Sequence, residues 1–156
     1  MLEENEMKKK SLIFAFVLGS VLLFLVGCRA VDPNNPIPYD NAPTANTTEM
    51  VDYLSKVAKE DAKSTAVSDS VAIDFIRNTY PNFYTDNATM EKAMYYGYLL
   101  EYRHQEDSTD YYQNITKLGM DTEQAVKYVY RGVEAVDDDA TQENLKQISE
   151  SLAEIK

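Results

Sequence analysis

Histidine is the side chain best suited to acid–base chemistry near neutral pH, and this chain has one, His104. Glu101 precedes His104 by three residues, so both side chains would share a helix face and the carboxylate could orient the imidazole. A single histidine without a motif serine or a second cysteine supports neither a hydrolytic triad nor an ordinary zinc site. A surface or helix-end histidine is the simpler interpretation, and we assign no catalytic residue.

An acidic run, Asp137 to Asp139, raises the question of calcium binding. The run lacks the alternating oxygen ligands, the central glycine and the final glutamate of an EF-hand loop. Carboxylates at the start of a helix are favourable by themselves, because they meet the positive end of the helix dipole. Glycine-rich phosphate-binding patterns are also absent from the sequence. We therefore predict no metal site and no cofactor.

Cys28 is the only cysteine, so it cannot form a disulfide within the chain. It ends an uncharged run, residues 11–28, which follows three lysines at positions 8–10. This order of charged and apolar residues is typical of an export signal. The length of the run is also close to the roughly 20 apolar residues of a membrane-spanning helix, so length alone does not decide between the two.

The end of this run, Leu25-Val26-Gly27-Cys28, resembles the lipobox of bacterial lipoproteins. The resemblance implies cleavage between Gly27 and Cys28 and transfer of a diacylglycerol to the Cys28 thiol. Two acyl chains hold a protein stably on a bilayer, so we expect a lipid-anchored protein on the extracytoplasmic face of the cell membrane. The alternative is an uncleaved signal anchor in which Cys28 only ends the helix. The predicted domains are a signal peptide (1–27, removed), a lipidated linker (28–48) and a folded domain (49–156).

The linker is rich in proline and asparagine, and residues 29–48 hold four of the five prolines. Such a segment has few large apolar groups with which to offset the entropy lost on ordering. We expect a disordered tether that extends at about 3.1 Å per residue and lifts the domain roughly tens of Å from the bilayer. A proline-rich peptide ligand is the other interpretation.

From Thr48 onward, apolar residues recur at helical spacing and no two consecutive segments alternate as strands do. We predict an all-α fold, a small bundle of five or six helices. Pro81 should end the second helix and Gly119 a short fourth one, while Asp121 and Gln124 have the spacing of a capping box for the fifth. The expected helix starts are Thr47 or Thr48, Asp69 or Ser70, Asn87, Ser108 or Thr109, Asp121, and the turn at Asp137 to Asp139.

Tyrosine is unusually frequent, with twelve copies and no tryptophan. Tyr95, Tyr98 and Tyr102 share one face of the helix expected after Asn87, and apolar residues occupy the opposite face. Because tyrosine is enriched in binding surfaces, these three residues are our candidate binding surface. The other interpretation, which the sequence favours, is a central helix whose tyrosine rings are buried and whose hydroxyl groups meet water. In it, Gly97 and Gly132 allow other helices to approach closely.

The charge of the chain excludes some partners. Three lysines and three glutamates cancel in the leader, so the formal net charge of −11 belongs to the chain from Cys28 onward. Nucleic-acid phosphates and bare anionic headgroups would both be repelled. We expect no nucleic-acid partner, and attachment to the membrane only through the lipid on Cys28.

Residues 118–129, LGMDTEQAVKYV, resemble the turn and second helix of the helix-turn-helix repeats in host-cell-surface-exposed lipoproteins of temperate phages. That family is lipid-anchored and associated with superinfection exclusion, which keeps the DNA of a second phage out of the cell. The resemblance implies a module that binds an envelope or phage protein rather than an enzyme. The alternative is a small envelope hydrolase or ligand-binding protein that uses a tyrosine-rich cleft with His104 and Glu101.

Overall fold

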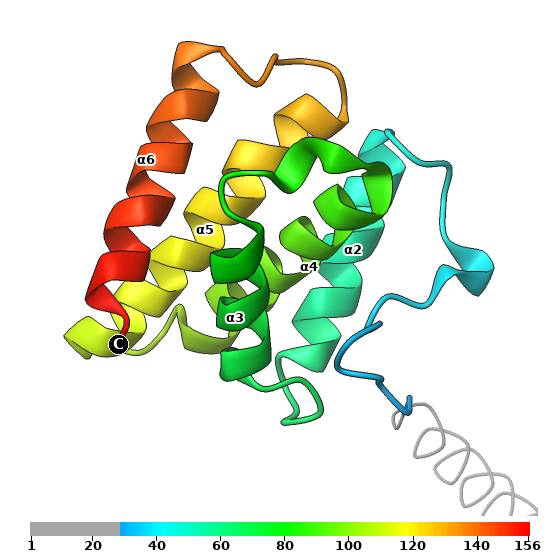
Figure 1. Ribbon diagram of the computed structural model, residues 1–156. Helices are drawn as coiled ribbons and strands as arrows, with labels where there is room; N and C mark the ends of the chain where they lie inside the picture. Colours follow the sequence, from blue (N-terminus) through cyan, green and yellow to red (C-terminus); the bar gives the residue numbers. More distant parts are fainter. Residues whose placement is uncertain (1–28) are drawn as a thin grey trace, which may run out of the picture. The chain divides into compact units, whose positions relative to one another are not determined.

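The computed structural model describes residues 29–156 and is all-α there, as predicted (Figure 1). The predicted signal peptide and Cys28 lie outside the described residues. The five helices are α2 (Thr48–Asp61), α3 (Asp69–Thr79), α4 (Asn87–His104), α5 (Asp110–Tyr130) and α6 (Asp139–Glu154), with short 3₁₀ turns η1 (Tyr39–Asn41) and η2 (Phe83–Thr85). In this described part, no helix is long and apolar enough to cross a membrane.

Short polar side chains cap the N-terminal ends of three of the helices. Thr47 Oγ1 accepts the Met50 N–H at the start of α2, and Asp86 Oδ1 accepts the Thr89 N–H (2.7 Å) at the start of α4. Ser68 does the same for α3. Each bond satisfies a backbone donor that has no partner within its own helix. The predicted starts of these three helices are confirmed to within one residue.

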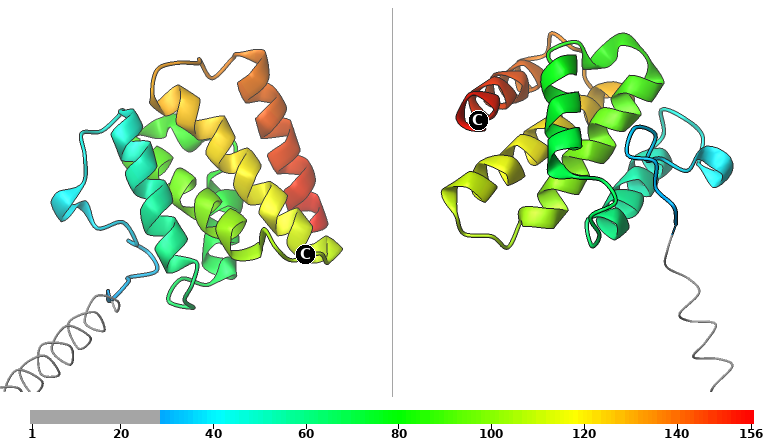
Figure 2. Two further views of the ribbon diagram at one scale, coloured as in Figure 1. Left: turned by 180° about the vertical axis from the view of Figure 1, so that it is seen from behind. Right: turned by 60° about the horizontal axis from the view of Figure 1, so that its bottom comes forward.

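Helix α4 is the centre of the bundle, with contacts to α2, α3 and α5 (Figures 1 and 2). Every residue from Ala93 to Leu100 is buried. A helix that is apolar or sterically small all round must be covered on all sides, which explains its central position. Helix α6 packs chiefly on α5.

Helix α5 differs from the prediction, because one continuous helix replaces a short helix, a turn at Gly119 and a capping box at Asp121. Gly119 lies in the middle of α5, where it faces Gly97 of α4. A Cβ atom on Gly119 would lie 2.5 Å from the Gly97 carbonyl oxygen and 2.8 Å from the Glu101 nitrogen. Gly119 is therefore needed for close helix packing and not for ending a helix.

Gly132, which we expected at a helix contact, instead ends α5. Its φ is +69°, and a Cβ atom there would meet nothing within 4 Å. The Gly132 N–H donates to the Val129 carbonyl and the Val133 N–H to the Tyr128 carbonyl, both at 2.9 Å. This pair of bonds is the Schellman motif, which requires the left-handed backbone that glycine adopts readily.

Residues 31–47, which we call the strap, also differ from the prediction. We expected a disordered tether, but the strap packs along α2 and α4, and Pro36 and Ile37 are buried. The hydroxyl of Tyr96 donates to the Pro33 carbonyl (2.7 Å) and that of Tyr53 to the Pro38 carbonyl. The compact unit runs from Val31 to Lys156, so these residues belong with the helical domain.

Proline composition explains why the strap can be ordered without a core of its own. Proline has a fixed φ and no N–H, so less entropy is lost on ordering and fewer donors need partners. The carbonyl groups of the strap still need donors, and tyrosines from α2 and α4 supply them. Local composition could not reveal those distant partners.

Candidate functional site

The candidate surface formed by Tyr95, Tyr98 and Tyr102 is not on the outside of the protein. Tyr95 is 0% exposed and Tyr98 7% exposed, and Tyr102 is partly buried. The rings of Tyr98 and Tyr102 stack with their centroids 5.9 Å apart. Helix α4 is covered by α5 on one side and by α2 on another, which leaves these rings inside the bundle. Our surface hypothesis is therefore wrong, and the alternative of a central helix with buried rings is confirmed. The hydroxyl group of Tyr95, which we expected to meet water, is instead buried.

The hydroxyl groups of the buried tyrosines are held by acceptors inside the bundle. Tyr95 donates to Asp61 Oδ2 (2.8 Å), and Tyr102 shares a hydrogen bond with Ser55 (2.7 Å). Tyr84 donates to the Ala125 carbonyl (3.1 Å). A buried hydroxyl is costly unless it is hydrogen-bonded, and these bonds remove that cost. The tyrosines thus act as internal cross-links between helices.

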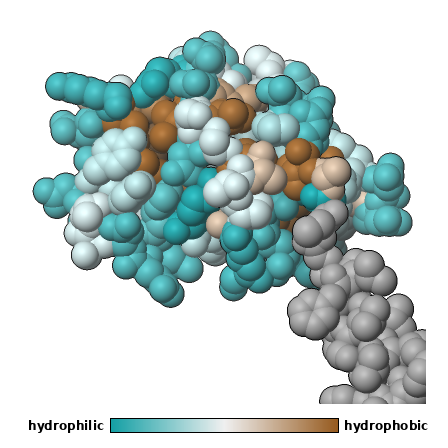
Figure 3. All heavy atoms as spheres, turned by 90° about the horizontal axis from the view of Figure 1, so that it is seen from below, coloured by the Kyte–Doolittle hydropathy of each residue, from teal (hydrophilic) through white to brown (hydrophobic). Residues whose placement is uncertain are grey.

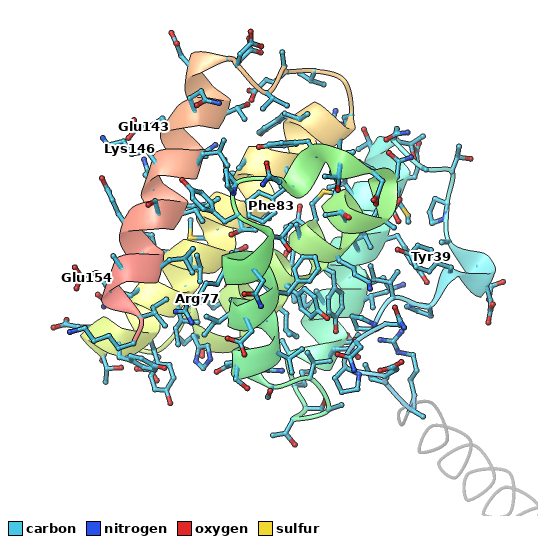
Figure 4. All side chains as sticks on the ribbon, viewed as in Figure 1. Tyr39, Arg77, Phe83, Glu143, Lys146 and Glu154 are labelled. Carbon is cyan, nitrogen blue, oxygen red and sulfur yellow. The ribbon has the colours of Figure 1, made fainter. Side chains whose placement is uncertain are left out.

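Glu91 receives two such bonds and is 4% exposed. Its Oε1 accepts the hydroxyl of Tyr130 at 2.5 Å, and its Oε2 accepts the hydroxyl of Tyr39 at 2.8 Å. We call these three residues the Glu91 latch. Loss of solvent raises the pKa of Tyr39 and Tyr130 well above the usual value, and the adjacent Glu91 carboxylate adds to the shift. The latch joins the strap, α4 and the end of α5, and Figure 4 labels Tyr39 at the edge of the bundle.

A second group of acids lies between α4 and α5. Glu123 is 4% exposed, and its two oxygens lie 2.9 and 3.1 Å from Lys127 Nζ. Burial raises the pKa of Glu123 although Lys127 opposes the shift. Burial also raises the pKa of Glu101, and the negative charge of Glu123 adds to that shift. Glu123 has almost no access to solvent, so this pair of carboxyl groups affects stability more than chemistry at the surface.

His104 is the last residue of α4, so the interpretation of a helix-end histidine is confirmed, but the carboxylate that orients its ring is Asp69 and not Glu101. Its Nε2 lies 2.7 Å from Asp69 Oδ2 on α3, and its ring stacks on Tyr112 with centroids 4.4 Å apart. Asp69 Oδ1 accepts a bond from Arg103 at 2.6 Å, and Arg103 also donates to the Ser64 carbonyl at 2.9 Å. This group of residues fastens the start of α3 and the loop before it to the end of α4. Sequence spacing could not identify Asp69, which is 35 residues from His104.

The acidic run before α6 serves as a turn. Asp138 is the N-cap residue of α6, and its Oδ2 accepts the Ala135 N–H at 2.7 Å. Asp139 lies in the first turn, where the helix dipole favours a negative charge. Within residues 29–156, no three His, Cys, Asp or Glu side chains are placed to share a metal ion.

The described surface includes an open hollow that the sequence did not predict. It lies between α5 and α6 and has a volume of about 450 Å³. Lys117 borders it and is paired with Asp121 (2.9 Å). The hollow is lined by Asn114, Lys117, Glu150, Ser151, Ala153 and Glu154. Because these are ordinary helix-surface residue types from two separate helices, the sequence carries no signal for the hollow. Figure 4 labels Glu154 at the lower end of α6.

Apolar surface is scattered. The exposed large apolar side chains of the described residues come from four parts of the chain, and two of them share the turn before α6: Tyr39, Tyr111, Met120, Val133 and Val136. On the face shown in Figure 3, the brown apolar areas are separated by hydrophilic side chains. Isolated apolar residues are normal on a soluble surface and do not define an interface.

Comparisons with protein-family models, with curated proteins and with solved structures found no match. The predicted resemblance to phage-encoded surface lipoproteins included a turn near Leu118 to Asp121. The structure has uninterrupted helix at those positions, because α5 runs from Asp110 to Tyr130. The helix-turn-helix part of that prediction is therefore wrong for this chain.

Proposed function

We propose that this protein is attached to the extracytoplasmic face of the cell membrane by lipid on Cys28 and acts by binding another macromolecule of the envelope. The observation that carries the proposal is the order of three lysines, an apolar run and Leu25-Val26-Gly27-Cys28, which ends at the only cysteine of the chain. A lipidated mature protein would be confined to the membrane surface, where its partners are envelope proteins or the proteins of an arriving phage.

Two features of the folded part support a binding module rather than an enzyme. The tyrosine hydroxyls bond to carboxylates and carbonyls inside the bundle, as Tyr95, Tyr96 and Tyr130 illustrate. His104 is fixed by Asp69 and covered on one ring face by Tyr112. These bonds tie the helices and the strap to one another, and a surface that is ordered before binding loses less entropy when it binds a partner.

Superinfection exclusion is one specific form of this proposal. In that form, cells that carry the protein would adsorb a second phage normally but would not receive its DNA. Adsorption and DNA delivery can be measured separately in cells with and without the chain. Equal DNA delivery in both kinds of cell, for every phage that adsorbs, would exclude this form while leaving other envelope partners open.

The general proposal is tested by cross-linking in intact cells followed by purification of the lipidated protein. We expect a discrete envelope partner that is recovered with the native chain and lost with Cys28→Ser, which should not be lipidated. The same partner recovered equally with both chains would contradict a role for the anchor.

The alternative, a small envelope hydrolase, draws on one observation, the 2.7 Å bond between His104 and Asp69. A carboxylate that orients an imidazole is part of many hydrolytic sites. The variant His104→Ala distinguishes the two functions. If the variant still recovers the same partner and still has the cellular effect of the native protein, the binding module is favoured. If it recovers the partner but has lost that cellular effect, the enzyme is favoured.

A further inference from the structure

The strap begins close to the proposed lipid anchor. Val31 is the third residue after Cys28, and three residues can span at most about 10 Å. The compact unit starts at Val31. If residues 28–47 were instead free and extended, they would span about 60 Å. The distance between bundle and bilayer therefore depends on how firmly the strap is attached.

The strap is bonded to the helices along its length. Near its start, Lys92 Nζ donates to the Asn34 carbonyl (2.9 Å) and to Asn35 Oδ1 (3.0 Å), and Tyr96 donates to the Pro33 carbonyl. Further on, Tyr39 joins the strap to the buried Glu91 near the start of α4. These bonds, with the buried Pro36 and Ile37, leave little slack between Val31 and α2.

The start of the strap lies beside the C-terminal half of α2 (Figures 1 and 2). This part of the structure carries exposed lysines at positions 56, 59 and 63, although Lys63 is paired with Glu60 at 2.9 Å. The N-terminal end of α6 and the turn before it lie at the far end of the bundle in both views, and Glu143 is labelled there in Figure 4. That end carries Asp137, Asp138, Asp139 and Glu143, although Glu143 lies 3.8 Å from Lys146, so its charge is negative overall.

We infer that the strap holds the bundle directly on the bilayer, with the C-terminal half of α2 near the lipid and the N-terminal end of α6 facing away. This inference rests on the proposed lipidation of Cys28. The charges agree with it, because an anionic bilayer attracts lysines within a Debye length and repels the acidic end of α6. The membrane partner is a lipid surface, and the surface left for other macromolecules is the acidic end of the bundle.

The orientation can be measured with thiol-attached fluorophores in the lipidated protein. Lipidation blocks the Cys28 thiol, and the chain has no other cysteine, so Lys63→Cys or Glu143→Cys provides a single labelling position. Both positions are exposed. The labelled proteins are inserted in phosphatidylglycerol–phosphatidylethanolamine vesicles that contain a lipid with a nitroxide on its headgroup. A folded unit of this length has a radius of gyration of about 14 Å, so its two ends differ in height by roughly 30 Å.

We expect strong quenching of the label at position 63 and little at position 143. Inserting about twenty Gly and Ser residues between Ala30 and Val31 should reduce the quenching at position 63 to that at position 143, because such a linker spans roughly 25 Å on average. Equal quenching at the two positions without the insertion would overturn the inference. So would a difference that the insertion leaves unchanged.

A separate measurement distinguishes failure of the inference from failure of the proposed function. Metabolic labelling with a fatty acid shows whether Cys28 carries lipid. Lipid on Cys28 with equal quenching overturns the inference alone, whereas unlabelled protein overturns the proposed function and the inference with it.

Discussion

Gly97 of α4 and Gly119 of α5 face each other at the point where the two helices cross. A Cβ atom on Gly97 would lie 2.8 Å from the Gly119 carbonyl oxygen, and one on Gly119 would lie 2.5 Å from the Gly97 carbonyl oxygen. Such distances are too short for real contacts, so the backbones approach here because neither residue has a side chain. Helix α4 is covered by α5 along this crossing, which buries Tyr98 and Leu100.

The variant Gly119→Ala should destabilise the domain by about 1–3 kcal/mol, because the methyl group forces two backbones apart. Alanine in an ordinary helix interior would instead stabilise by up to about 1 kcal/mol. Gly119→Asn separates the two interpretations further, since asparagine is tolerated at the end of a helix but is larger still at a crossing. Urea denaturation measures the stability of the native protein and of both variants. A rise in stability for Gly119→Ala, or near-native stability for Gly119→Asn, would contradict the observed crossing.

The Glu91 latch should contribute measurably to stability. Tyr130→Phe removes a hydrogen bond to a buried carboxylate, and the expected loss is about 1.5–3 kcal/mol. Tyr111→Phe is the matched control, because Tyr111 is exposed and should change stability by less than about 0.5 kcal/mol. Tyr39→Phe should in addition speed amide hydrogen exchange in the strap. Equal melting curves for Tyr130→Phe and Tyr111→Phe would argue against the latch.

The acids between α4 and α5 make stability depend on pH. Burial raises the folded-state pKa of Glu101 and Glu123, so the folded state binds protons more tightly than the unfolded state. Stability should therefore fall as the pH rises from the unfolded-state value near 4.3 through the raised folded-state values. Glu101→Gln should raise stability at neutral pH and reduce this dependence. Glu106 is exposed and lies five residues after Glu101 in the sequence, so Glu106→Gln controls for the change in net charge. Identical pH profiles for the two variants would contradict this account.

Asp69 should contribute more to the stability of the domain than a typical surface carboxylate does. Asp69→Asn weakens bonds to Arg103 and His104 that are 2.6 and 2.7 Å long, and the expected cost is about 1–3 kcal/mol. Asp74 is the matched control on the same helix. It faces Arg77 at 3.7 Å with both side chains well exposed, so Asp74→Asn should cost at most about 1 kcal/mol. Chemical denaturation measures the stability of the two variants. A larger loss of stability for Asp74→Asn than for Asp69→Asn would contradict the importance of the bonds to Arg103 and His104.

Features that depend on neighbouring residues were predictable from the sequence. The helix start at Thr47 and Thr48 and the end forced by Pro81 follow from local chemistry, and the structure has both. The two-sided burial of the helix with Tyr95 and Tyr98 also follows, because both of its faces carry large side chains.

Features that depend on residues far apart were not predictable. Gly119 and Gly132 exchange their expected roles, since only the approach of α4 distinguishes a packing glycine from a terminating one. The strap has a composition typical of disorder, yet it is ordered by Tyr53 and Tyr96, which lie 15 and 63 residues from the carbonyl groups that they bond. His104 likewise bonds to Asp69 rather than to its near neighbour Glu101.

The N-terminal peptide of the mature protein tests the central claim most directly. Protein extracted from membranes by detergent is digested, and the N-terminal peptide is identified by mass spectrometry. We predict a peptide that begins at Cys28 and carries a diacylglycerol on its sulfur, and Cys28→Ser should yield no such peptide. A membrane-bound protein whose leader is intact and whose Cys28 is unmodified would contradict lipid anchoring.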